Sequence, residues 1–197
     1  MDYVYIDGSN FLIEAQRVSA VSTGLAKTIF HAQTQGIFDN AYRIDFSRLF
    51  SFLVGVGGKE LARVTFFGSQ ASTSESCWHF ARKAGFELIL NQRTHGKEKK
   101  VDTAIATHMT KDAYKHGRPG VDKFVLVAGD KDYVPPVSEL TKDAYVVQTL
   151  FWDHAADELK KAATEFLPVN DYLDYLRLCP SANNVYSERS PSPRERS

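Results

Sequence analysis

The sequence predicts an α/β protein with three α/β/α layers around a mainly parallel central sheet of about five strands. Short apolar runs, typical of buried strands, alternate with longer segments in which apolar residues recur at helical spacing. This alternation is the pattern of repeated βαβ units, whose sheets are covered on both faces. Hydrophobic residues make up 43% and charged residues 24% of the 197 residues, as in an ordinary globular core.

The first half of the chain is expected to hold three strands, each followed by a helix or a loop. Residues 19–40 are small, polar and weakly patterned, so we expect either an insertion or a loosely packed excursion there. The other expected elements, in chain order, are a strand at 4–6, a helix through Phe11, Leu12 and Ala15, a helix at 46–53, a strand at 62–68, a helix at 78–84 and a strand at 86–90.

The second half continues the alternation and then changes composition. Its expected elements are a helix at 101–113, a strand at 123–128, a helix from about 133 that covers Val137 and Leu140, a strand at 145–150 and a helix at 155–163. Residues 179–197 are rich in Ser, Pro, Arg and Glu and cannot bury apolar surface. We therefore expect one domain over 1–178 and a disordered C-terminal tail over 179–197.

The amino-acid composition limits which partners and which cellular compartment can be expected. Lys and Arg together number 24, as do Asp and Glu, so bulk electrostatic attraction to nucleic acid is not expected, although a local basic patch can exist. Only Cys77 and Cys179 occur, which excludes a disulfide framework and favours a reducing, cytoplasmic location. No stretch approaches the about 18 apolar residues of a membrane span. No membrane partner is expected, and a homo-oligomer is left open.

Four carboxylates are expected to meet at one edge of the sheet. Asp7 ends the first strand, Asp130 and Asp132 follow the buried strand at 123–128, and Asp102 lies in the first turn of the helix that starts near 101. Ligands of open parallel sheets bind at the carboxyl ends of the strands. Carboxylates a few ångströms apart repel one another and need protons or a divalent cation, and oxygen-only ligands select Mg²⁺ or Mn²⁺. The set predicts a metal site.

Each aspartate also has a plain structural explanation. Asp132 sits where a helix N-cap would sit, with Pro135 at the third helical position. Asp102 gains from the helix dipole, and Asp7 can simply end a strand in a turn. Individually these readings are as good as the metal site, but together they do not predict carboxylates at neighbouring strand ends.

A basic loop precedes Asp102. It carries four cationic residues against the single acid Glu98, and these are Arg93, Lys97, Lys99 and Lys100. Because the chain fixes this loop next to Asp102, we expect it to contact phosphates, with an ordinary solvated charged loop as the alternative.

Three segments resemble the signature segments of NYN domains, the LabA-like branch of the PIN-like nuclease superfamily. They are residues 5–10 (YIDGSN), 100–106 (KVDTAIA) and 126–135 (LVAGDKDYVP), and the resemblance runs from about 3 to 168. The segment at 155–163, followed by Phe166, is similar to the family's closing segment. The sequence departs from the family pattern at Ala128, where serine is common, at residues 143–144, where glycine is common, and at Thr164, where aspartate is frequent.

The resemblance implies a PIN-like fold and a metal-dependent endoribonuclease that acts on RNA. Asp7, Asp102, Asp130 and Asp132 would hold one or two Mg²⁺ or Mn²⁺ ions that activate water for attack on the phosphodiester. Asn10 would help to position the substrate. Ser9 lies beside it in the same motif and is expected to be a hydrogen-bonding helix cap near the substrate rather than a nucleophile.

Two other functions stay open at this point. The first is a non-catalytic RNA-binding or regulatory module that keeps the fold, and the second is a small-molecule phosphatase that uses the same ions. The intact set of four carboxylates favours the enzyme, because a pure binder gains nothing from negative charges that face phosphate without metal.

Overall fold

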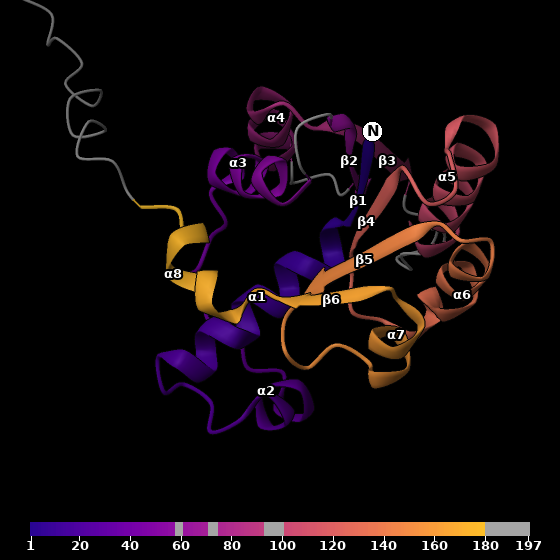
Figure 1. Cartoon of the computed structure of the whole chain (residues 1–197). Helices are drawn as coiled ribbons and strands as arrows, with labels where there is room; N and C mark the ends of the chain where they lie inside the picture. The colour runs from indigo at the N-terminus through magenta and orange to yellow at the C-terminus, as the bar shows by residue number, and fades with distance from the viewer. Residues whose placement is uncertain (58–60, 71–74, 93–100, 180–197) are drawn as a thin grey trace, which may run out of the picture.

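A parallel sheet forms the centre of the computed structural model, which describes residues 1–57, 61–70, 75–92 and 101–179 (Figure 1). Within these residues the sheet has six strands in the order β3-β2-β1-β4-β5-β6, and every neighbouring pair is parallel. The strands are β1 (Asp2–Asp7), β2 (Leu61–Gln70), β3 (Glu87–Gln92), β4 (Lys123–Val127), β5 (Val146–Phe151) and β6 (Glu165–Pro168).

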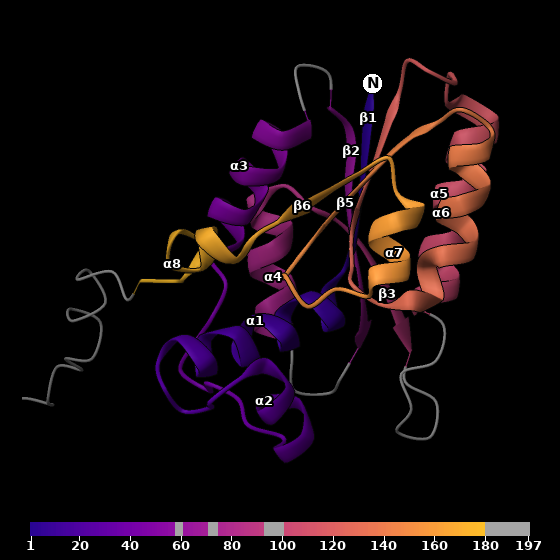
Figure 2. The ribbon, with the colours of Figure 1, turned by 60° about the horizontal axis from the view of Figure 1, so that its bottom comes forward.

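Helices cover both faces of this sheet (Figure 2). Their bounds are α1 (Gly8–Ser22), α2 (Ile29–Gln35), α3 (Phe46–Gly57), α4 (Glu75–Ala84), α5 (Val101–His116), α6 (Val134–Lys142), α7 (Asp157–Ala162) and α8 (Leu173–Leu176), with two short 3-10 helices, η1 (Lys131–Tyr133) and η2 (Asn170–Tyr172). In the described ranges, no helix has both the length and the apolar character that crossing a membrane requires.

Two hydrophobic cores lie on opposite faces of the sheet. One packs α1, α3, α4 and α8 against β1, β2 and β5, with Phe11, Leu49 and Phe66 fully buried. The other packs α5, α6 and α7 on the opposite face, with Ile105 and Leu140 at its centre. Strands covered on both faces are apolar throughout rather than alternating, which is why β4 was the clearest strand in the sequence. The α/β/α prediction is confirmed.

The prediction of about five strands missed β6. This edge strand pairs with β5, but it contains only two apolar residues between Glu165 and Pro168, and none of its residues is fully buried. An edge strand of this kind carries neither the apolar run nor the alternation that identifies a strand in a sequence.

The expectation of an insertion or a loosely packed excursion at 19–40 is only partly met. Helix α1 continues to Ser22 and α2 follows, so about half of the segment is helical. Ala20, Ala26 and Ala32 form a small core of their own, and the Ser19 hydroxyl donates a hydrogen bond of 2.6 Å to buried Asp39. Alanine and serine pack closely without a long apolar stripe. For this reason the composition did not indicate that residues 19–40 form a well-packed arm.

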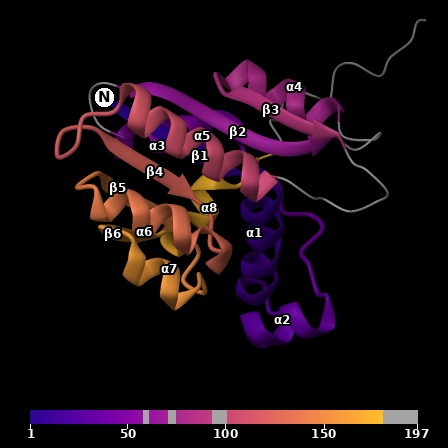
Figure 3. The ribbon, with the colours of Figure 1, turned by 90° about the vertical axis from the view of Figure 1, so that its right-hand side faces the viewer.

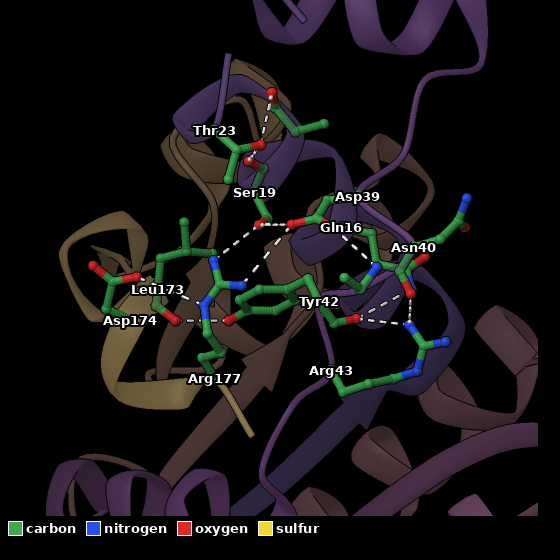
Figure 4. Close-up of polar contacts among 12 residues, drawn as sticks. Gln16, Ser19, Thr23, Asp39, Asn40, Tyr42, Arg43, Leu173, Asp174 and Arg177 are labelled. Carbon is green, nitrogen blue, oxygen red and sulfur yellow. Dashed lines mark hydrogen bonds and ion pairs between the residues drawn. The ribbon is translucent and has the colours of Figure 1, made fainter. Parts of the chain in front are cut away.

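The residues after β6 contact α1 and the chain before α3 (Figure 4). The Tyr42 hydroxyl donates to the Leu173 carbonyl at 2.7 Å, and the Arg177 guanidinium lies 4.7 Å from the centre of the Tyr42 ring. Arg177 also pairs with Asp39 and donates to the Ser19 hydroxyl. The C-terminal segment thus holds α1 and the chain before α3 together. Residues 180–197 of the expected tail lie outside the described part of the chain.

Ala144 occupies the turn before β5, where glycine is common in the resembling family. Its φ is 63°, in the left-handed region, and its carbonyl accepts a hydrogen bond from Gly120 N–H. An L side chain costs about 1–2 kcal/mol there. We expect Ala144→Gly to raise the free energy of unfolding by about 1 kcal/mol, after the larger unfolded-state entropy of glycine is subtracted. Thermal denaturation should show a midpoint a few degrees higher. A lower midpoint would contradict the assignment of strain to this turn.

Candidate active site

The strand order reverses direction between β1 and β4. From β1 the chain builds outward through β2 and β3, and from β4 it builds the other way through β5 and β6. Such a switch point is where open α/β sheets bind ligands, outside the carboxyl ends of the strands. Asp7 ends β1, and Asp130 lies three residues after the end of β4, so both carboxylates stand at the switch point.

Asp7 is held in place by hydrogen bonds from two directions. Its Oδ1 accepts from the Asn10 N–H at 3.1 Å, which makes Asp7 the N-cap of α1, and its Oδ2 accepts from the Tyr133 hydroxyl at 2.7 Å. Asp7 is only 9% exposed. The expectation that Ser9 caps this helix is wrong, because the helix starts at Gly8, so that Ser9 lies in its first turn and Asp7 fills the cap.

Two glycines let the backbone approach closely around these aspartates. A Cβ on Gly8 would lie 2.0 Å from the Phe66 ring, and a Cβ on Gly129 would lie 2.1 Å from the Phe151 ring. Gly129 N–H donates to the Asn10 side-chain oxygen at 3.0 Å, which ties the start of α1 to the loop that carries Asp130. The glycines of both motifs therefore serve the close packing of β1, β4 and their following loops.

Asp130 immediately precedes the short helix η1 after β4, and Asp132 lies within it. Asp130 caps η1 by accepting a 3.1 Å hydrogen bond from the Asp132 N–H, and both side chains are exposed. The alternative that Asp132 is the N-cap is wrong, since α6 begins after Tyr133 without a side-chain cap, and Pro135 takes its second position rather than the third.

Asp102 is the fourth carboxylate of the site and comes from helix α5. It lies in the first turn of α5, where buried Val101 fixes the helix against the sheet and leaves Asp102 exposed. The four aspartates line one cleft of about 380 Å³, together with Ser9 and Asn10. Burial, helped by the charges of Asp7, Asp102 and Asp130, raises the pKa of the Tyr133 hydroxyl, so this tyrosine stays protonated and remains a donor to Asp7.

The donor chemistry of this cleft fits a hard divalent cation, since its lining offers carboxylate, amide and hydroxyl oxygens and no Cys or His. Across the described ranges, however, no three His, Cys, Asp or Glu side chains are gathered as closely as the ligands of one metal ion. The four carboxylates line the same cleft, but in the structure they do not form such a group. Because Asp102, Asp130 and Asp132 are exposed, their side chains can change rotamer without repacking the core.

Sequence reasoning missed two charged residues of the cleft, Glu14 and Arg17. Glu14 is only 6% exposed and pairs with Arg17 one turn further along α1. Their spacing from Asn10, four and then three residues, is the signal that could have found them, because such residues share one helix face.

The four cations of the basic loop cannot be placed in this way. Arg93, Lys97, Lys99 and Lys100 lie outside the residues that the structure describes. Their contact with phosphate stays a prediction that rests on their position immediately before Asp102.

Comparison with known proteins supports the fold and the family. A solved structure of a protein of unknown function from Vibrio parahaemolyticus is similar, with a TM-score of 0.63 and 18% sequence identity over 90% of this chain and 95% of that one. At this identity the likeness shows the fold alone. No curated protein matches the chain. The family model described as NYN domain matches residues 3–174, which span β1 to α8 and include the whole cleft, and the chain therefore belongs to the NYN domain family.

Proposed function

We propose that this NYN domain is an endoribonuclease of the LabA-like branch that depends on Mg²⁺ or Mn²⁺ and acts in the cytoplasm. The observation that carries the proposal is that Asp7, Asp102, Asp130 and Asp132 line one cleft at the switch point of the sheet. NYN domains are nuclease-like as a family, and a cleft lined by four carboxylates suits phosphodiester chemistry only when a cation offsets their charge.

In this proposal the aspartates hold the ion and the rest of the cleft holds RNA. A bound Mg²⁺ or Mn²⁺ supplies a water of lowered pKa and stabilises charge on the attacked phosphate. Asp7 would be the fixed ligand, because two hydrogen bonds already orient it, and the exposed aspartates would be adjustable ones. Asn10 has its side-chain oxygen bound to Gly129 N–H, so its amide NH₂ group is the part that would donate to a phosphate oxygen beside Ser9.

A non-catalytic RNA-binding module is the second candidate. It is favoured by one observation, that no ready-made group of three metal ligands exists among the described side chains. In that case Asp7 and Asp130 would serve only as helix caps, and removal of the charge of Asp130 would not weaken metal binding.

Replacement of Asp130 with asparagine separates these candidates. Calorimetric titration of the wild type with Mn²⁺ should show binding, and Asp130→Asn should weaken it by about 100-fold, because a charged ligand is lost while the volume and an acceptor oxygen remain. Asp171→Asn, in η2 and outside the cleft, is the matched control and should bind Mn²⁺ as the wild type does. Equal affinity in the Asp130 and Asp171 variants would contradict the metal site.

Tyr133→Phe tests whether the orientation of Asp7 matters. The variant removes the hydroxyl that donates to Asp7 and keeps the buried ring, so we expect Mn²⁺ affinity to fall by about 10-fold. Tyr145→Phe is the control, since its buried hydroxyl donates to the Ala113 carbonyl in the same core. Both variants should lose about 1 kcal/mol of stability. If both variants leave the Mn²⁺ affinity unchanged, the hydroxyl of Tyr133 has no part in orienting a metal ligand.

A further inference from the structure

A second hollow, of about 570 Å³, adjoins the carboxylate cleft and shares Asn10, Glu14 and Asp130 with it. It lies between α1 and α2 on one side and the loops that follow β4 and β5 on the other. Helices α1 and α2 extend past the carboxyl edge of the sheet (Figure 3). Their residues Asn10, Glu14 and Gln33 make one wall of the hollow. The residues that give the hollow its chemistry are Gln33, Lys131, Phe151 and His154.

Glu14 connects the elements that surround this hollow. Its carboxylate accepts hydrogen bonds from His154 Nε2 at 2.7 Å, from Gln33 Nε2 at 3.3 Å and from Arg17. Burial alone would raise the pKa of the Glu14 carboxyl, but the bond and charge of His154, the charge of Arg17 and the bond from Gln33 together lower it. Glu14 is therefore ionised, and it joins α1, α2 and the loop after β5 in one fixed arrangement.

The groups around Glu14 suit a nucleoside better than a phosphate. Gln33 and His154 each use one nitrogen for Glu14, so the Gln33 amide oxygen and the second ring nitrogen of His154 are the groups left to bind a ligand. Such donors and acceptors bind base edges and the ribose 2′-hydroxyl in unpaired RNA. Lys131 supplies an exposed cation in the wall.

We propose that this hollow is a subsite for the base and ribose of one nucleotide adjacent to the scissile phosphate, which lies in the carboxylate cleft. The proposal rests on the proposed function for the position of the phosphate. A volume of about 570 Å³ is within the range of about 300–1,000 Å³ that small-ligand sites occupy. Because the subsite lies in a recess beside the cleft, the strand that enters it is unpaired at that nucleotide.

Gln33→Ala tests the subsite with little risk to the fold, because Gln33 is exposed on α2. The full chain is mixed with a fluorescein-labelled, unstructured oligoribonucleotide, and binding is followed by anisotropy in EDTA. Loss of one recognising group should raise Kd by about threefold to tenfold. In Mn²⁺ the same variant should raise KM by a similar factor and leave kcat and Mn²⁺ affinity within twofold. Gln35→Ala, exposed on the same helix and outside the hollow, is the matched control.

A second variant, His154→Asn, should weaken RNA binding in the same way. If Gln33→Ala binds RNA as Gln35→Ala does, the subsite is wrong even when the wild type cleaves RNA. If Gln33→Ala weakens RNA binding but the wild type cleaves nothing in Mn²⁺, the subsite is supported and the proposed nuclease function is wrong. Absence of RNA binding by the wild type would overturn both.

Discussion

Asp102→Asn should reduce metal-dependent RNA cleavage by about 100-fold or more while the fold stays intact. Asparagine keeps the volume and one acceptor oxygen of the side chain but removes its charge, so the affinity for the cation falls. Asp102 is exposed at the start of α5 and contributes little to stability. RNA binding in EDTA should be retained or become tighter, because a negative charge that faces phosphate has been removed.

Asp7→Asn should lose cleavage to the same extent but should also lower stability. Asp7 caps α1 and accepts from Tyr133, and loss of such a cap costs about 1 kcal/mol. Asp171→Asn serves as the control for both variants. Cleavage by Asp102→Asn at the wild-type rate would show that this carboxylate has no part in the reaction.

Leu176→Ala should be among the most destabilising single changes in the C-terminal segment. Leu176 is fully buried in the core that contains α1 and α3, and removal of a buried leucine side chain costs about 2–5 kcal/mol. We expect the thermal midpoint to fall by roughly 4–20 °C, since each kcal/mol shifts a domain of this size by about 2–4 °C. Leu178→Ala, at a position that is 49% exposed, is the control and should change little.

The same measurement tests the domain boundary expected at 178. A chain that ends after Cys179 should keep its midpoint within a few degrees, because the residues removed are rich in Ser, Pro, Arg and Glu. A loss of about 2 kcal/mol or more on this truncation would show that residues 180–197 pack on the domain.

Elements with strong local patterns were predictable from the sequence. The apolar runs of β1 and β4 and the helical spacing of Val101, Ile105 and Met109 determine burial directly, so their positions were found within a few residues. The arm at 19–40 and the edge strand β6 were not found. Their positions depend on tertiary contacts, such as the Ser19–Asp39 hydrogen bond and the pairing of Glu165 with Gln148, which leave no periodic signal.

For the candidate site, the strand ends predicted where the aspartates would lie but not what holds them. Asp7, Asp102, Asp130 and Asp132 share a cleft because their elements meet at the switch point, and this follows from the order of the strands. The Tyr133 hydroxyl that orients Asp7 is 126 positions away along the chain, and the His154 ring lies 140 positions from Glu14. Contacts of such long range follow from the fold and are invisible in a local motif.

The most direct test of the account is RNA cleavage by the purified wild-type protein in Mn²⁺, in Mg²⁺ and in EDTA. Labelled unpaired and structured RNAs are incubated under each condition, and products are separated on a denaturing gel. We expect internal cleavage of RNA with Mn²⁺ or Mg²⁺, none with EDTA, and restoration when excess Mn²⁺ is returned. Cleavage that persists in EDTA, or intact RNA under every condition while RNA still binds, would contradict the metal-dependent nuclease.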